Sequence, residues 1–366
     1  MRHLFYLLII LFFSNIKAQS VDSILLVAKT LKHDTDRINL LYKQGFDKRT
    51  SNPQYSYECA KKAESYAQKV SLPYYSAKVN NLLGILYYRK GELKKAITYH
   101  MNALNIRTAI NDKKGMALSN LNLGNVYTDL HNYSLAESYY LKSLQINSEL
   151  NNEEQINNCL INLGILASQQ RKDEVASEYF TTVLNSAKKN NNYELQAMSF
   201  NNLAVIKMNT QKFEESIALS HNSIKAKELS ENEVEKADSY LNIALCYLFL
   251  NDLKQTQTFL QISDSIINRF GYLAAKLNYL QIEHQYFNEL NDYKNAYNSL
   301  NLLHKLNDSI LLANKEAKLE NDFIEFIEDP KHDSSPKNSD TGIYWFWGIL
   351  ILLGISLFMF VLKNKR

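Results

Sequence analysis

The sequence predicts an all-α solenoid, a stack of about seven helical hairpins, because small residues recur along it at one fixed spacing. A glycine or alanine returns every forty residues from residue 84 to residue 244, and an apolar residue precedes each one. A second column of small residues lies twelve positions further on, at Ser56, Ala96, Ala136, Ala176, Ser216, Thr256 and Ala296. Self-similarity at a period of this size indicates stacked supersecondary units.

Each copy of the pattern is predicted to form two antiparallel helices, which we call helix A and helix B. In the clearest copy, residues 120–144, apolar residues follow helical spacing on both sides of a polar break at residues 129–132. A second break separates successive copies, and asparagine or glycine there suits a left-handed helix cap. These breaks fall at Ser71, Asn111, Asn151, Asn191, Glu231 and Gly271. Because one hairpin cannot bury its own apolar face, neighbouring copies are expected to share a continuous core.

The glycines inside helix A indicate close packing. Glycine within a helix costs about 1 kcal/mol relative to alanine, yet helix A carries one at Gly84, Gly124 and Gly164. We expect helix B to cross at this point, where a larger side chain would push the two backbones apart. In the first and last copies Lys43-Gln44 and Glu283-His284 replace the apolar and small pair, which is typical of terminal capping repeats.

These columns resemble the tetratricopeptide repeat (TPR) family. The leucine–glycine pair, the tyrosine three residues later (Tyr87 and Tyr127) and the alanine twelve residues later stand where the family has them, over about 260 residues. The resemblance implies a superhelix of hairpins whose helices A face a concave groove. The copies are six residues longer than the family's usual repeat of about thirty-four, and they lack its proline at the end of helix B.

The N-terminal end reads as a secretory signal peptide over residues 1–18. A basic start is followed by ten apolar residues, 4–13, and the segment ends on the small residue Ala18. Ten residues are about half the length that spans a bilayer as a helix, so removal is favoured over an uncleaved anchor. The solenoid is then expected over residues 21–305.

The C-terminal end predicts a transmembrane helix at residues 343–362, which are twenty consecutive residues without a charge. Interfacial aromatics lie at one rim, and the basic residues of 363–366 mark the cytoplasmic side. We therefore expect a single-pass cell-membrane protein with a periplasmic solenoid and a cytoplasmic tail at 363–366. Two alternatives stay open. One is a core helix, and the other is a cleaved sorting signal, whose threonine–glycine pair residues 341–342 resemble without the preceding leucine–proline.

Two further segments are predicted between the solenoid and the membrane. The apolar stripe continues through residues 306–328, which predicts a capping and juxtamembrane helix, and the two prolines of residues 329–342 predict a flexible linker. This order resembles the extracytoplasmic part of bacterial sensor histidine kinases that carry TPR repeats. No kinase region is present in the sequence, so signalling would have to pass through a separate membrane partner.

No motif for chemistry stands out. The eight histidines are scattered, and the sequence has no zinc-binding histidine pair, no glycine-rich phosphate loop and no nucleophile elbow. A net charge of +3 does not suggest nucleic acid. Cys59, Cys159 and Cys246 lie in non-adjacent repeats and are predicted to be small buried residues. We therefore predict no enzyme, no metal and no cofactor.

One row of polar residues predicts a binding surface. Two positions before the glycine column stand Asn122, Asn162, Asn202 and Asn242. The row is similar to the asparagine ladder with which some TPR superhelices hold an extended peptide. A primary amide can pair with both N–H and C=O of a peptide backbone, and Asn125 would line the same groove, with weaker indications for Tyr88, Asp129 and Gln285. Alternatively, the amides link helix A to helix B or to each other, or simply reflect a sequence rich in asparagine.

The function predicted from the sequence is binding. The chain is expected to be a membrane-anchored TPR module that holds a protein or peptide partner in its concave groove. The alternative is a sensor or receptor subunit of a signal-transduction system that acts through a separate membrane partner.

Overall fold

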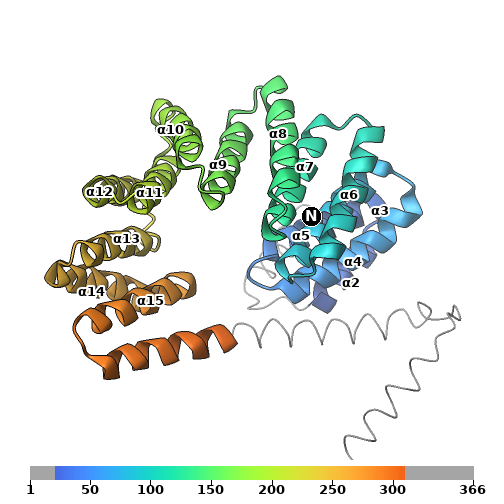
Figure 1. The fold of residues 1–366 in the computed structure, drawn as a ribbon. Helices are drawn as coiled ribbons and strands as arrows, with labels where there is room; N and C mark the ends of the chain where they lie inside the picture. Colours follow the sequence, from blue (N-terminus) through green and yellow to red (C-terminus); the bar gives the residue numbers. More distant parts are fainter. Residues whose placement is uncertain (1–20, 310–366) are drawn as a thin grey trace, which may run out of the picture. The chain divides into compact units, whose positions relative to one another are not determined.

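The computed structural model describes residues 21–309, and this part is helical with no strand (Figure 1). Helix α2 (Val21–Thr30) precedes seven antiparallel hairpins. The helices A are α3 (Asp34–Lys48), α5 (Pro73–Arg89), α7 (Lys113–Asp129), α9 (Glu153–Gln169), α11 (Tyr193–Asn209), α13 (Lys236–Phe249) and α15 (Leu273–Glu289). The helices B are α4 (Pro53–Val70), α6 (Leu93–Ala109), α8 (Tyr133–Glu149), α10 (Asp173–Lys189), α12 (Phe213–Leu229), α14 (Leu253–Phe270) and a final helical segment at residues 293–309. The predicted all-α solenoid of about seven hairpins is confirmed.

From α4 onward, successive helices are separated by turns that recur every twenty residues. One residue of each turn has a positive φ: Ser71, Gly91, Asn111, His131, Asn151, Arg171, Asn191, Gln211, Glu231, Asn251, Gly271 and Asn291. The six breaks predicted between copies are all among them, so their left-handed caps are confirmed. The turns inside the hairpins have the same geometry from the second hairpin on, whereas the turn at residues 49–52 in the first hairpin has no positive φ. The forty-residue repeat therefore consists of two similar halves, and most of its helices are 17 residues long.

Side-chain caps fix where many of these helices begin. The residue before the helix accepts a hydrogen bond from the third backbone N–H within it, at Asn52, Asp112, Asn132, Asn152, Asn192 and Asp252. Each cap of this kind contributes about 1 kcal/mol. The asparagine-rich composition thus has a structural role in the turns, apart from the row on helix A.

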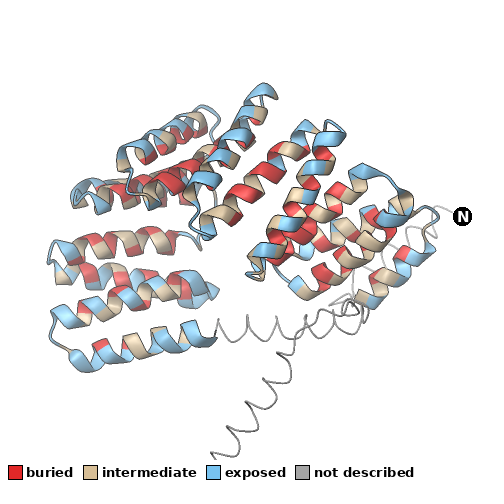
Figure 2. Cartoon of the chain, turned by 45° about the vertical axis from the view of Figure 1, so that its right-hand side comes forward, coloured by how far each residue is buried: buried red, intermediate tan, exposed pale blue. Residues whose placement is uncertain are grey.

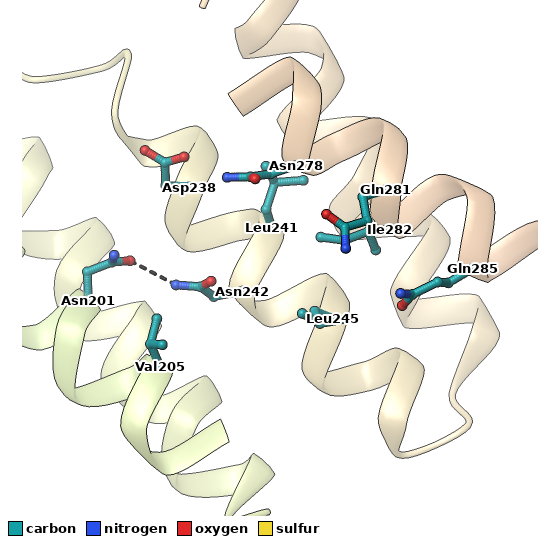
Figure 3. Close-up of a pocket in the computed structure, with 10 residues that line it drawn as sticks. All are labelled: Asn201, Val205, Asp238, Leu241, Asn242, Leu245, Asn278, Gln281, Ile282 and Gln285. Atoms are coloured by element: carbon teal, nitrogen blue, oxygen red, sulfur yellow. Dashed lines mark hydrogen bonds between the residues drawn. The ribbon is translucent and has the colours of Figure 1, made fainter. Parts of the chain in front are cut away.

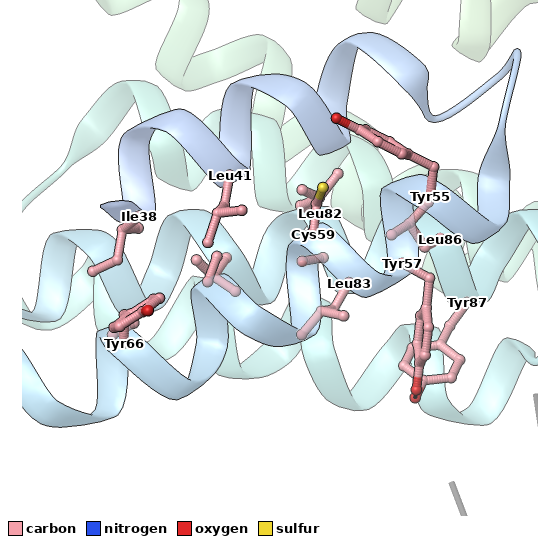
Figure 4. Packing of buried hydrophobic residues seen from close by; sticks show 14 of the residues in the cluster. Ile38, Leu41, Tyr55, Tyr57, Cys59, Tyr66, Leu82, Leu83, Leu86 and Tyr87 are labelled. Atoms are coloured by element: carbon pink, nitrogen blue, oxygen red, sulfur yellow. Dashed lines mark hydrogen bonds between the residues drawn. The ribbon is translucent and has the colours of Figure 1, made fainter. Parts of the chain in front are cut away.

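The helices form two layers, and within residues 21–309 their buried apolar residues group into four clusters and not into the one continuous core expected from the sequence. Successive helices A contact one another, whereas no two of the helices B from α4 to α14 do, so helices A form the inner layer. Buried residues lie along the faces where helices meet (Figure 2). At the N-terminal end one buried cluster contains Ile38 and Leu41 of α3 together with Leu82 and Leu83 of α5 (Figure 4). Helix α2 adds Ile24 to this cluster, although its short pattern alone does not predict a separate helix.

The space beside each helix-A glycine is filled by an aromatic ring of helix B. A β-carbon added at the glycine would lie only 2.4 to 2.7 Å from that ring. The pairs are Gly84 with His100, Gly124 with Tyr140, and Gly164 with Phe180. The expected contact between two backbones is therefore corrected, because the glycine makes room for a ring that helix B carries sixteen residues later.

We expect Gly124→Ala to lower the free energy of unfolding by about 1 kcal/mol. Crowding a packed core costs about 1–3 kcal/mol, and the higher helix propensity of alanine offsets about 1 kcal/mol of this cost. In a Tyr140→Leu background the same substitution should cost nothing, because the chain itself pairs Ala244 with Leu260 at these positions. Urea unfolding of the four variants measures this coupling. An equal cost in both backgrounds would contradict the ring as the cause.

Several predicted segments lie outside the described residues. They are the signal peptide at 1–18, the linker at 329–342, the transmembrane helix at 343–362 and the tail at 363–366, and the helix at 306–328 is described only as far as residue 309. Within residues 21–309 no helix is both long and apolar enough to cross a membrane. The three cysteines, all in this part, are buried and unpaired as predicted.

Candidate functional site

The predicted row of asparagines lies half-buried on the inner helices, and two of its members join successive helices A. Asn122 Nδ2 on α7 donates to Asn81 Oδ1 on α5 at 3.0 Å. Asn242 Nδ2 on α13 donates in the same way to Asn201 Oδ1 on α11 at 2.9 Å. In each pair the donating asparagine, Asn122 or Asn242, keeps its second Nδ2 hydrogen and its Oδ1 outside this hydrogen bond. The row is therefore partly structural, as one alternative proposed, but its partners come from a neighbouring column.

The other candidates have different environments. Asn202 Nδ2 donates to the Met198 carbonyl of its own helix at 3.0 Å. Asn125 Oδ1 accepts from Tyr140 Oη at 2.8 Å, which links helix A to helix B. Asn162 is half-buried on α9 and makes no side-chain hydrogen bond within the described residues. The five asparagines thus do not form one uniform ladder. The structure instead distinguishes two amide pairs, three repeats apart.

A buried cation of helix B is hydrogen-bonded to each amide pair, directly in the first pair and through a serine in the second. Arg107 of α6 is 6 % exposed, and its Nη1 donates to Asn81 Oδ1 at 3.3 Å, to Ser119 Oγ at 2.7 Å and to the Gly115 carbonyl at 3.0 Å. This cation reaches from helix B through to the helix-A layer. Its guanidinium therefore fixes the acceptor to which Asn122 donates.

The second cation repeats this arrangement 120 residues later. Lys227 of α12 is 4 % exposed and donates to the Glu235 carbonyl and, at 3.3 Å, to Ser239 Oγ. Ser239 Oγ lies 3.3 Å from Asn201 Oδ1. Burial lowers the pKa of both cations. Sequence reasoning missed these residues, although the spacing of 120 that relates them was available as a signal.

A pocket of about 340 Å³ opens on the inner face at the second amide pair (Figure 3). Residues of three successive helices A line it. The apolar ones are Val205, Leu241, Leu245 and Ile282, and the polar ones are Asn201, Asp238, Asn242, Asn278, Gln281 and Gln285. The structure therefore brings the predicted Asn242 together with Gln285, and it adds three amides that the sequence did not single out.

Asp238 is the one carboxylate that lines this pocket. Burial raises its pKa, while the hydrogen bond from Tyr272 Oη at 2.9 Å and the charge of Lys227 act in the opposite direction. With the carboxylate held by a phenol and a cation behind it, the pocket is dominated by neutral amides. Such a lining can pair with backbone N–H and C=O groups and bury an apolar side chain.

Two other predicted groove residues form a separate contact. Burial raises the pKa of Tyr88 on α5, and its hydrogen bond to the Asp129 carboxylate on α7 raises it further. Within residues 21–309 no three His, Cys, Asp or Glu side chains form a group that could hold a metal ion. The absence of enzymatic activity stays a prediction.

Comparisons with known proteins agree with this architecture. A tetratricopeptide repeat family model matches residues 75–149 and 115–189. No curated protein matches the sequence. The resemblance to sensor histidine kinases stays a prediction.

Several solved structures have a similar fold. The apo form of RapI has a TM-score of 0.62 at 17% identity, over 75% of this chain and 98% of that one. A Rap protein complexed with Competence and Sporulation Factor has a TM-score of 0.59 at 17% identity, over 82% of this chain and 90% of that one. NprR in complex with its cognate peptide NprX has a TM-score of 0.51 at 16% identity, over 88% of this chain and 89% of that one. At these identities the likeness concerns the fold, and the chain is thus an all-α solenoid that contains tetratricopeptide repeats.

Proposed function

We propose that the inner face of the helix-A layer binds an extended polypeptide segment of a partner protein. The observation that carries this proposal is the pocket at the amide pair Asn201–Asn242, where an apolar floor is bordered by side-chain amides. An amide pair that is braced by a buried cation loses little freedom when it binds, so its hydrogen bonds to a ligand backbone cost less entropy.

The similar folds support the same reading by analogy. The Rap protein is in complex with Competence and Sporulation Factor, and NprR is in complex with its cognate peptide NprX. Both are only 16 to 17% identical to this chain, so they suggest a class of ligand and not its sequence. The pocket adds a site in this chain at which such a ligand would be held.

We place the solenoid outside the cytoplasmic membrane, anchored by the uncharged segment at residues 343–362. In this setting the partner is a periplasmic or membrane protein. Signalling through a separate membrane partner is a more specific form of the same proposal, since it too requires a bound segment.

The test is a selection from a random library of 12-residue peptides displayed on phage, with the full chain as bait. We expect peptides that bind at least tenfold more weakly to Asn242→Ala, because losing about 1–1.5 kcal/mol of hydrogen bonding is about tenfold in affinity. Asn185→Ala is the matched control, since Asn185 is an exposed asparagine of the outer helix α10. Failure to enrich any peptide, or equal binding to all three proteins, would overturn the proposal.

A further inference from the structure

The N-terminal end of the inner face carries cations that lie over aromatic rings. Lys78 Nζ of α5 lies 4.3 Å from the ring centroid of Tyr42 on α3, and 6.0 Å from that of Tyr74. The Arg49 guanidinium at the end of α3 lies 3.8 Å from the ring of Phe46. We call these five residues the basic end of the groove. The rings hold the cations in place and contribute no negative charge.

The first amide pair and its buried cation adjoin the basic end. Burial raises the pKa of Tyr42, and the positive charges of Arg107 and Arg49 act in the opposite direction on the same phenol. Both guanidinium groups therefore lie close enough to the phenol to influence its ionisation. The charges of Arg107 and Arg49 therefore act on the same ring of the basic end.

This region has more donors than acceptors. Asn81 is 1 % exposed, and its Nδ2 has no hydrogen-bond partner among the described residues, nor does Arg107 Nε. The Oδ1 of Asn81 is already used, because it accepts from both Arg107 and Asn122. Both donors are buried, so a ligand would have to bind at the half-buried side chains of Lys78 and Arg49 instead.

None of the five residues of the basic end is a carboxylate. Asp112 Oδ2 lies 3.9 Å from Arg107 Nε, and the other oxygen of this carboxylate caps α7 at the Gly115 N–H. Neither Arg49 nor Lys78 forms an ion pair within residues 21–309. The pocket at the second amide pair differs, because its lining includes Asp238 and no lysine or arginine. The two ends of the inner face therefore favour different ligand charges.

We propose that the basic end of the groove binds an acidic segment of the partner polypeptide, whose carboxylates accept hydrogen bonds from Lys78 and Arg49. The inference rests on the proposed function and adds a specificity to it. Acidic residues of the ligand would meet the basic end, and neutral or apolar residues would meet the pocket at Asn242. Complementary charge of this kind selects partners and speeds their association.

The same peptide selection tests the inference. We expect one class of enriched peptides to contain at least threefold more Asp and Glu than the unselected library. Synthetic peptides of this class should bind Lys78→Met and Arg49→Met at least tenfold more weakly than the wild type. Replacing the Glu residues of the peptide by Gln should lower its affinity for the wild type by a similar factor. Raising the salt concentration should also lower the affinity of these peptides, because salt screens exposed charges. Lys254→Met is the matched control, since Lys254 is exposed on the outer helix α14.

The outcomes separate this inference from the proposed function. Peptides that lose affinity with Asn242→Ala but carry no excess of acidic residues would overturn the acidic specificity alone. Acidic peptides indifferent to Lys78→Met and Arg49→Met would also overturn it. The chain has an acidic stretch of its own at residues 319–329. If replacing its five carboxylates by amides in the full chain raised peptide affinity tenfold, the basic end would belong to that stretch and not to a partner.

Discussion

Replacing Arg107 by methionine is expected to lower the free energy of unfolding by about 3 kcal/mol. The guanidinium is buried and donates to three neutral acceptors, on Asn81, Ser119 and Gly115. Methionine would fill part of the volume but leave the serine hydroxyl and the carbonyl without their donor. Each buried group that loses its partner costs about 1–3 kcal/mol. Urea unfolding followed by circular dichroism measures the change.

The chain supplies its own control for this substitution. Lys227 occupies the equivalent position in the second network and donates to the equivalent carbonyl and serine. Arg107→Lys should therefore keep two of the three hydrogen bonds and cost about 1 kcal/mol. Replacing a buried charge by a well-packed apolar residue can also be neutral or stabilising. If Arg107→Met were as stable as the wild type, the network would be a cost to stability rather than a support for the amide pair.

Acidification is expected to destabilise the fold through His100. This side chain is 1 % exposed, packs against Gly84, and has no hydrogen-bond partner for Nδ1 among the described residues. Burial, with a smaller contribution from the charge of Arg107, lowers the pKa of His100 to about 3. In the unfolded chain the pKa is near its ordinary value of about 6.5. Below that value the unfolded state binds a proton that the folded state excludes.

The sign of the effect follows from this difference. The contribution of neutral His100 is fully present above the unfolded pKa and is lost as pH falls from about 6.5 towards 3. Between pH 7 and pH 4.5 the loss amounts to about 2.5 kcal/mol. The measurement is the free energy of unfolding in urea at these two pH values.

The matched variant for this prediction is His100→Phe. The chain already places Phe180 against Gly164 at the equivalent position, so the ring is expected to fit. Carboxylates elsewhere titrate alike in both proteins, and the difference between them isolates the histidine. A variant that lost as much stability on acidification as the wild type would show that His100 is not the acid-sensitive group.

The sequence determined the repeat and its turns. Local chemistry suffices for these features, because a cap such as Asn111 or Gly271 needs only its own backbone conformation, and the apolar spacing needs only the period of a helix. The column Asn122, Asn162, Asn202 and Asn242 was likewise visible as a pattern. Its placement on the inner helices follows from the register of helix A, which the family resemblance already implied.

Tertiary structure decided what those residues do. In the sequence, Gly124 and Tyr140 are sixteen residues apart and nothing links them. Only the packing of α8 against α7 places the Tyr140 ring in the space beside Gly124. Asn122 and Asn242 look equivalent to Asn162 and Asn202 in the sequence. They differ because Asn81 and Asn201, on the preceding helices A, present an acceptor to them. Such partners lie some forty residues apart in the chain, and periodicity gives the column of a residue but not the side chain opposite it.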